Sequence, residues 1–414
     1  MNNHQSWNVI TLFLLLIFGF TIATILKPQR SFSERENRVL ATRPAPTVST
    51  ILSGSFEKDY EDSLTDQFVL RDQWIALRSA VEKLVQKKDI HDVYLGKDGY
   101  LIEKHTDTFT TGHALENVEH LKNFAAQAAS RYGTEHVAVM VVPNAVDILK
   151  EKLPPFADPY DEEEYLARIE TSLPKGVWIG VSDVLRKAAQ SSGQQLYYRT
   201  DHHWQCFGSY RGYRDVFALL RLAEQGEQIN SPVKVPDASL GIDGEERVTD
   251  EEGNQAVLVS RFYHDSKARS TGTPKQFLGY MYAYQFHYVP MQITRDGESY
   301  QYGDDEKYLH NKEVWIEDGI RYGLMYGRDE GELIFDTGRR ERPNILVMGD
   351  SFDNAVLRLL AGHYNQLHSI DLRHYETQKG HAFNMSEYIR KNDISTVLFL
   401  GNNGLFMAVR FTKF

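Results

Sequence analysis

The chain has 414 residues, of which 42% are hydrophobic and 25% are charged, and its formal net charge is −11. This length allows one large domain with insertions or two domains that share a cleft, and the composition is typical of a globular protein. The acidic balance and the lack of a basic cluster argue against a nucleic-acid partner. The single cysteine excludes an internal disulfide framework and leaves the redox compartment undecided.

An apolar segment without charged residues extends from residue 8 to residue 26. A transmembrane helix needs about 20 such residues, so this segment is long enough to span a bilayer. A cleaved signal peptide is the alternative, but no Lys or Arg precedes the segment and no small-x-small site follows it cleanly. The sequence therefore predicts an uncleaved N-terminal membrane anchor.

After a polar stretch with several prolines, apolar residues recur every three or four positions between Phe56 and Lys88. This spacing predicts amphipathic helices that pack on a core. A hairpin is expected at residues 93–102, a helix at 115–132 and a buried strand at 136–142. A helix followed by an apolar strand is the start of an α/β pattern.

The α/β pattern continues from residue 151 to residue 222. An acidic helix is expected within 151–173, and we expect its run of acids at 161–164 to form a solvated face. The other expected elements are strands at 177–181 and 195–198 and helices at 184–189 and 207–222.

The segment from residue 231 to residue 342 interrupts this alternation. Gly, Asp and Thr separate short β-like runs, such as those at 257–259 and 280–284, which predicts an inserted β-rich subdomain. The insertion could form the wall of a substrate cleft, or it could be a rigid lid without substrate contact. The α/β pattern returns at residue 343, with strands expected at 367–373 and 395–400 and a helix at 385–391.

A strand-to-helix passage near residue 350 carries the first candidate for chemistry. An apolar run ends at Gly-Asp-Ser-Phe, residues 349–352, and a helical pattern follows from Asn354 to Leu360. This geometry lifts a serine hydroxyl off the C-terminal edge of a sheet, where backbone N–H groups can stabilise an oxyanion. An ordinary loop with an N-cap uses the same residue types, so the motif needs a base and an acid elsewhere.

The Asp-His-His-Trp segment at residues 201–204 supplies a base and an acid. A serine becomes nucleophilic when an imidazole takes its proton, and a carboxylate fixes the tautomer of that imidazole. Asp201 and His203 are two positions apart, so in an extended segment their side chains leave the same face. A zinc site is the alternative, but no further well-spaced Cys or His is present. We therefore expect Ser351, His203 and Asp201 to be catalytic without a metal or cofactor, and His202 to hold the loop or touch substrate.

The two motifs together resemble the DHHW family of bacterial proteins, which is similar to the SGNH-hydrolase-like O-acetyltransferases of alginate and other exported polysaccharides. Further segments with the same pattern lie at residues 32–38, 62–78, 93–101 and 142–144, so the resemblance spans most of the chain. It implies a three-layer α/β fold of SGNH-hydrolase type and a serine site that forms or cleaves esters. The relay residues precede the nucleophile, which suggests a permuted order of the sequence blocks.

The resemblance also indicates candidates for the oxyanion hole. Gly-Asn-Asn at residues 401–403 follows a buried strand and resembles the Gly-x-Asn block of SGNH hydrolases, which makes Asn403 the candidate amide donor. A plain Asn-Gly turn is the alternative. The separate glycine block of SGNH enzymes is not visible after Ile370. The residues that could stand in for it are Arg373, His374 and Tyr375.

The function implied by the resemblance is that of a membrane-anchored serine acyltransferase. It would O-acetylate an exported cell-surface polysaccharide through an acyl-serine, with acetyl supplied across the membrane by a membrane-bound acyltransferase partner. One alternative is an acetyl-ester hydrolase with the same triad. Another is a non-catalytic, polysaccharide-binding scaffold whose triad is vestigial.

Charge and family point to opposite membrane orientations. Lys27, Arg30, Arg35 and Arg38 come after the apolar segment, and the positive-inside rule would keep the bulk of the chain in the cytoplasm. The family resemblance implies an extracytoplasmic catalytic domain, and we follow it. The expected organisation is an anchor at 1–27, a linker at 28–55, two parts of the SGNH-like domain at 56–230 and 343–414, and the insertion at 231–342.

Overall fold

The computed structural model of the chain consists of two compact units. One unit comprises Met1–His91 with Asp265–Pro274, and the other comprises Asp92–His264 with Lys275–Phe414. This division does not test the domain boundaries expected from the sequence, which remain predictions. The structure describes all residues except 1–2, 34–37, 106–108, 110–112, 192–193, 235–246, 261–266, 268–270, 274–278, 296, 303–321, 328, 409 and 412–414. Part of the family-like segment at 32–38 therefore lies outside the described residues.

The first unit begins with a long apolar helix. Within α1 (Asn3–Leu26), the 20-residue segment Trp7–Leu26 reaches a mean hydropathy of 2.7 over 18 consecutive residues, so the helix is long and apolar enough to cross a membrane. The elements after it are β1 (Phe32–Ser33), β2 (Arg38–Val39), α2 (Val48–Leu52), α3 (Ser55–Asp66), α4 (Arg71–Leu84) and β3 (Asp89–Ile90).

The helices expected between Phe56 and Lys88 are present as α3 and α4, but the prediction that their apolar side chains pack on a core is wrong for both. On α3, Tyr60 and Leu64 are each 36% exposed, and its buried residues are Ser63 and Asp66. The exposure is larger on α4. Trp74, Leu77 and Val81 are 44%, 55% and 51% exposed. Ser79 is the buried residue of this helix. Periodicity shows that a helix has an apolar face, but it does not show what covers that face.

The second unit is built on an eight-stranded sheet with the order β12-β11-β13-β15-β14-β16-β6-β7. The strands from β15 to β7 run parallel, and the other three extend the sheet in antiparallel fashion. Their bounds are β6 (Val137–Val142), β7 (Trp178–Ile179), β11 (Met291–Arg295), β12 (Glu298–Tyr302), β13 (Glu332–Asp336), β14 (Asn344–Gly349), β15 (Gln366–Asp371) and β16 (Ile394–Asn402).

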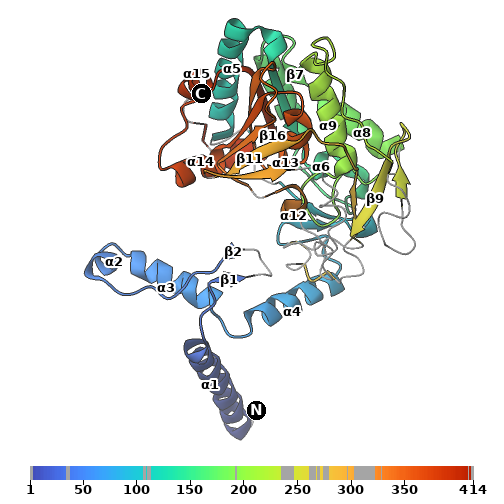
Figure 1. Cartoon of the computed structure of the whole chain (residues 1–414). Coiled ribbons are helices and arrows are strands. Elements are labelled where there is room, and N and C mark those ends of the chain that lie inside the picture. The colour runs from blue at the N-terminus through green and yellow to red at the C-terminus, as the bar shows by residue number, and fades with distance from the viewer. Residues whose placement is uncertain are drawn as a thin grey trace. The chain divides into compact units, whose positions relative to one another are not determined.

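Helices cover both faces of this sheet, which gives three layers (Figure 1). On β6, Ala138 and Met140 face one apolar cluster, whereas Val139 and Val141 face the other. Burial on both faces explains the uninterrupted apolar run of this strand. The helices on the first face are α8 (Val181–Ser191), α9 (Cys206–Leu219) and α13 (Asn354–Ala361), and those on the second are α5 (His113–Tyr132), α7 (Glu162–Ser172) and α15 (Met385–Lys391). The predicted three-layer α/β fold is confirmed.

The predicted β-rich character of the region between the two motifs is visible in two places. The strands β8 (Arg247–Thr249), β9 (Gln255–Ser260) and β10 (Met281–Ala283) form a separate antiparallel sheet. The strands β11 to β13 join the main sheet instead, next to β15. The hairpin β4 (Val93–Leu95) with β5 (Leu101–Glu103) is confirmed. The strand expected at 195–198 is reduced to a single bridge between Tyr197 and Trp204.

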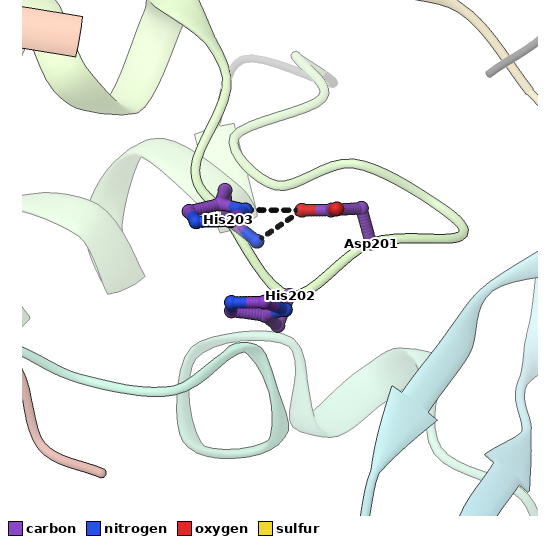
Figure 2. A group of neighbouring side chains, drawn as sticks. All are labelled: Asp201, His202 and His203. Atoms are coloured by element: carbon purple, nitrogen blue, oxygen red, sulfur yellow. Dashed lines mark hydrogen bonds and ion pairs between the residues drawn. The ribbon is translucent and has the colours of Figure 1, made fainter. Parts of the chain in front are cut away.

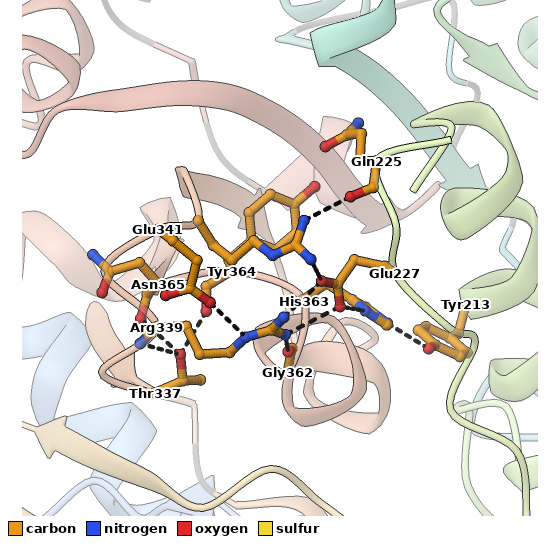
Figure 3. A network of polar contacts seen from close by, with 11 residues as sticks. Tyr213, Gln225, Glu227, Thr337, Arg339, Glu341, Gly362, His363, Tyr364 and Asn365 are labelled. Carbon is orange, nitrogen blue, oxygen red and sulfur yellow. Dashed lines mark hydrogen bonds and ion pairs between the residues drawn. The ribbon is translucent and has the colours of Figure 1, made fainter. Parts of the chain in front are cut away.

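The helices α9 and α13 are held together at their C-terminal ends by a network around Glu227 (Figure 3). The Glu227 carboxylate pairs with Arg339 at 2.7 Å and with His363 Nδ1 at 2.9 Å. His363 Nε2 lies 2.7 Å from the hydroxyl of Tyr213, which belongs to α9. The opposite ends of these two helices carry the motifs at 201–204 and 349–352, so the network fixes the frame on which the motifs meet.

Substitution of Gly349 is expected to destabilise the fold, because there is no room for a side chain at the end of β14. An added Cβ would lie 1.8 Å from the Leu400 carbonyl oxygen. We expect Gly349→Ala to lower the free energy of unfolding by at least about 2 kcal/mol in urea denaturation, since the β16 backbone must move. Gly180→Ala is the control, because its Cβ would have an ordinary contact at 3.5 Å. Equal stability of Gly349→Ala and wild type would contradict this packing.

Candidate active site

The candidate site lies at the carboxyl edge of the parallel strands. Gly349 at the end of β14 is in register with Asp371 on β15 and with Leu400 on β16. The segments after these three strands therefore emerge at the same edge, where α/β proteins bind their ligands. Ser351, Arg373 and Asn403 all lie in these segments.

Asp201, His203 and Ser351 are joined by short hydrogen bonds. Asp201 Oδ1 lies 2.6 Å from His203 Nδ1, and His203 Nε2 lies 2.7 Å from Ser351 Oγ. The same carboxylate oxygen accepts the backbone N–H of His203 at 2.7 Å (Figure 2). All three side chains are buried. A carboxylate at Nδ1 keeps the proton on that nitrogen, which leaves Nε2 free to accept the proton of the serine.

Trp204 connects the relay loop to the nucleophile turn. Its indole N–H donates to the carbonyl oxygen of Phe352 at 2.9 Å, and its side chain is fully buried. The loop itself is closed by two backbone bonds, from Tyr198 N–H to the His203 carbonyl and from Gln205 N–H to the Leu196 carbonyl. The tryptophan of the Asp-His-His-Trp motif therefore holds the loop at 201–204 against the turn at 349–352.

Asp350, between the glycine and the serine of the second motif, holds the nucleophile turn. Its carboxylate accepts the backbone N–H of Phe352 at 3.0 Å and that of Asn402 at 2.9 Å. Burial raises the pKa of the Asp350 carboxyl above its usual range, and the positive charge of Arg373 opposes this shift. Asp350 therefore ties the turn after β14 to the end of β16.

The geometry also bears on the zinc alternative. Asp201, His202 and His203 each place a possible ligand atom within 4.8 Å of the others. Both ring nitrogens of His203 are already engaged, one by Asp201 and the other by Ser351. The ring of His202 packs on that of His203, with centroids 4.0 Å apart. A metal ion at this cluster would have to displace Asp201 or Ser351 from the ring of His203.

Tyr322 was not identified from the sequence, yet it contacts both His203 and Ser351. It begins α12 (Tyr322–Tyr326), and its ring stacks on that of His203 with centroids 3.7 Å apart and planes 3° apart. Its buried hydroxyl donates to the carbonyl oxygen of Ser351 at 2.8 Å. No motif marks this residue, which is one of 23 tyrosines in the chain.

Asn403 is fully buried beside the relay edge. Its backbone N–H donates to the Val142 carbonyl at 3.0 Å. Within the described residues, neither polar atom of its side chain has a partner at ordinary hydrogen-bond geometry, although the amide lies close enough to Glu162 to lower that group's pKa. Buried amides are nearly always satisfied, so this side chain has unused hydrogen-bonding capacity for a ligand.

The side chains considered for the missing glycine block lie in different surroundings. Arg373 pairs with Asp371 at 2.6 Å and with Asp329 at 3.0 Å. Its charge is therefore balanced at the same edge, and these two acids with His374 form a cluster that the guanidinium already occupies. Tyr375 packs its ring on Phe383, with centroids 5.0 Å apart, in the apolar layer on the second face.

The prediction that the acids at 161–164 form a solvated face is wrong for Glu162. This residue begins α7 and is fully buried, and its carboxylate accepts the backbone N–H of Asn144 at 2.9 Å and the side-chain amide of Asn144. Burial raises the pKa of Glu162 to about 7, and the hydrogen bonds from Asn144 together with the nearby Asn403 amide oppose this shift. Glu162 is the first residue of α7, and its side chain points toward the residue that follows the sequence Val141-Val142-Pro143, Asn144. The sequence does not single it out, because it stands in a run of four acids.

Comparison with known proteins defines the class. Residues 93–235, which include the Asp-His-His-Trp motif, match the family model of the SGNH hydrolase-like domain of the acetyltransferase AlgX. The matched part, which is less than half of the chain, therefore resembles an SGNH hydrolase-like acetyltransferase domain. No curated protein sequence matches the chain.

Solved structures share the fold. PatB1 of Bacillus cereus has 18% sequence identity and a TM-score of 0.54, over 76% of this chain and 97% of that chain. PatB1 with a sulfonyl adduct has 18% identity and a TM-score of 0.52, over 76% of this chain and 99% of that chain. A DHHW family protein from Eubacterium siraeum has 17% identity and a TM-score of 0.46, over 76% and 94% of the two chains.

Substitution of Tyr322 is expected to slow acylation of Ser351 in proportion to the contacts removed. Tyr322→Phe loses one hydrogen bond and should slow the reaction several-fold, and Tyr322→Leu also loses the stacked ring and should slow it by about 10-fold to 100-fold. The rate is measured as the burst with an activated acetyl ester. Tyr165→Phe is the control, since Tyr165 is also buried and donates to a backbone carbonyl, that of Ala114. Equal slowing in Tyr165→Phe would point to general destabilisation.

The raised pKa of Glu162 predicts a specific pH dependence of stability. An acid with a folded pKa above its unfolded value destabilises the fold as pH rises between the two values. For Glu162 the window runs from 4.5 to about 7, so this group costs up to about 3 kcal/mol by neutral pH. We therefore expect Glu162→Gln to lose less stability than wild type between pH 5 and pH 7, on the order of that amount, in denaturant unfolding. Parallel curves for the two proteins would contradict the assignment.

Proposed function

We propose that this protein is an O-acetyltransferase that carries its acetyl group on Ser351 and transfers it to a hydroxyl group of an exported cell-surface polysaccharide. The observation that carries the proposal is the continuous set of hydrogen bonds from Asp201 through His203 to Ser351 Oγ. Such a relay is the arrangement that activates a serine for acyl transfer. The match of residues 93–235 to an acetyltransferase domain supports transfer rather than hydrolysis.

In the first half-reaction, Ser351 Oγ attacks the carbonyl carbon of the acetyl donor as its proton moves to His203 Nε2. The buried carboxylate of Asp201 stabilises the imidazolium that results. When the tetrahedral intermediate collapses, the leaving group takes that proton from His203, and the acetyl group remains on Ser351 as an ester. The stacked ring of Tyr322 keeps the imidazole in the plane that serves both transfers.

The negative charge that develops on the carbonyl oxygen needs donors at the sheet edge. We assign the backbone N–H of Ser351, at the turn before α13, and the side-chain amide of Asn403 to this role. The buried Asn403 amide has unused hydrogen-bonding capacity among the described residues. A preorganised donor of this kind typically contributes a factor of about 100 to 1,000 in rate.

In the second half-reaction, a sugar hydroxyl takes the place of the leaving group. His203 removes its proton, the hydroxyl oxygen attacks the acetyl-serine, and Ser351 recovers its proton when the ester is released. Competition between this hydroxyl and water decides between transferase and esterase. The polysaccharide acceptor and a membrane-bound partner that supplies acetyl rest on the resemblance to the DHHW and alginate O-acetyltransferase families.

We also propose that α1 is an uncleaved single-pass anchor and that the catalytic unit lies outside the cytoplasm. The length and hydropathy of Trp7–Leu26 support the anchor. The basic residues after it favour the opposite orientation, so the outside location rests on the family resemblance.

Acetyl transfer by the full chain in lipid nanodiscs tests the proposal. The protein is given an activated acetyl ester and acetyl-free alginate oligosaccharides, and the sugars are analysed by mass spectrometry. We expect acetylated sugar with wild type and a loss of at least about 1,000-fold with Ser351→Ala and with His203→Ala. Ser369→Ala, a buried serine on the neighbouring strand β15, should retain activity.

The outcomes separate the alternatives. Free acetate without acetylated sugar, lost in the same two variants, would make the protein an esterase. Neither product from a correctly folded protein would favour the non-catalytic scaffold and would overturn the proposal.

A further inference from the structure

Helix α4 in the first unit presents its apolar side outward. Its apolar residues follow a spacing of four and three positions, which places them on one stripe of the helix. The members of this stripe are Trp74, Leu77, Val81 and Leu84, and they are 44%, 55%, 51% and 81% exposed. The opposite side of the helix holds its one buried residue, Ser79. A helix in a water-soluble surface has the reverse arrangement, so the stripe requires an apolar environment.

The same side of α4 touches the apolar helix α1. The ring of Phe20 on α1 contacts the ring of Phe68 at a centroid distance of 6.0 Å and that of Trp74 at 5.9 Å. Phe20 lies nearly two turns before the end of α1, which is about 9 Å along the helix axis. Trp74 therefore lies beside the apolar segment of α1 itself and not beyond its end.

Polar contacts fix the end of α1 against the helices after it. The backbone N–H of Val69 donates to Thr24 Oγ1 at 3.1 Å, and Arg43 donates to the Thr24 carbonyl at 2.8 Å. Arg30, just after α1, pairs with Asp72 at 2.9 Å. As a result, α3 and α4 extend crosswise from the C-terminal end of α1 (Figure 1).

An apolar notch of about 610 Å³ lies between α1 and these helices. Its lining includes Leu64, Phe68, Trp74 and Ile75 together with Thr21 of α1. Thr24, Thr65 and Arg71 complete the lining, and the volume of the notch is sufficient for part of a lipid chain.

We propose that α4 lies in the membrane surface, with its stripe in the boundary between lipid headgroups and hydrocarbon. The inference rests on the proposed membrane crossing of α1. An amphipathic helix of this kind inserts its apolar face roughly 5–10 Å below the headgroups, which agrees with the contact between Trp74 and Phe20. Tryptophan prefers this boundary, and the exposed Arg78 at the edge of the stripe can extend its charge toward the headgroups. The anchor is then one crossing helix with one helix lying on the surface.

The test measures the surroundings of the stripe in the full chain, inserted into nanodiscs of phosphatidylethanolamine and phosphatidylglycerol. A nitroxide label is placed through Leu77→Cys or Val81→Cys. The natural Cys206 does not compete, because it is buried and burial raises the pKa of its thiol. Val184→Cys on α8 is the matched control, since Val184 is an exposed aliphatic residue, 39% accessible, of the second unit.

We expect labels at 77 and 81 to collide several-fold more often with oxygen, which concentrates in lipid, than with a water-soluble nickel chelate. The label at 184 should show the opposite preference. Equal chelate access at 77, 81 and 184 would overturn the proposal, and so would shielding from both reagents, which would show that protein covers the stripe. Extraction of the chain from the membrane by alkaline carbonate would contradict the proposed membrane crossing of α1. Labelling of Ser351 by a sulfonyl fluoride tests the catalytic site separately, because it depends neither on α1 nor on the position of α4.

Discussion

The site depends on one hydrogen bond, from Ser351 Oγ to His203 Nε2, between residues 148 positions apart in the chain. Neither segment can fix this contact alone, because each is a short loop after a strand or a bridge. The contact exists because β14 lies inside a parallel sheet, because Trp204 is bonded to Phe352, and because α9 and α13 are joined at their far ends through Glu227 and His363. A permuted chain order leaves this geometry intact, since neighbours in the sheet need not be neighbours in sequence.

Holding Asp201, His203 and Ser351 together requires that several polar side chains be buried. Asp350, Glu162 and the side chain of Asn403 are all removed from water near the relay, and burial raises the pKa of both acids. Asp350 holds the turn to β16, Glu162 holds Asn144, and Asn403 has unused hydrogen-bonding capacity in the segment after β16. Polar groups that are satisfied only in one arrangement make that arrangement more specific, and they leave the site sensitive to single substitutions.

The meeting of Asp201, His203 and Ser351 could be predicted from the sequence, because these residue types and the two-residue spacing of the acid and the base have few other chemical explanations. The α/β pattern could be predicted from apolar strands such as β6, and the three-layer arrangement from the resemblance to SGNH hydrolases. The remaining features depend on tertiary position. Tyr322 reaches His203 from the short helix α12, Glu162 is buried by its place at the start of α7, and β11 to β13 pair with the main sheet and form no separate one. The exposed stripe on α4 shows the same limit, because periodicity identifies an apolar face without its partner.

The most direct test of the central claim is to find the acyl group on the enzyme. The full chain is mixed with an activated acetyl ester, quenched in acid within seconds, digested and analysed by mass spectrometry. A single acetyl group on the peptide that carries Ser351, absent in His203→Ala and strongly reduced in Asp201→Asn, is the predicted result. A folded protein that acquires no acetyl group, or one that acquires it on another residue while Ser351 stays unmodified, would contradict the acyl-serine mechanism.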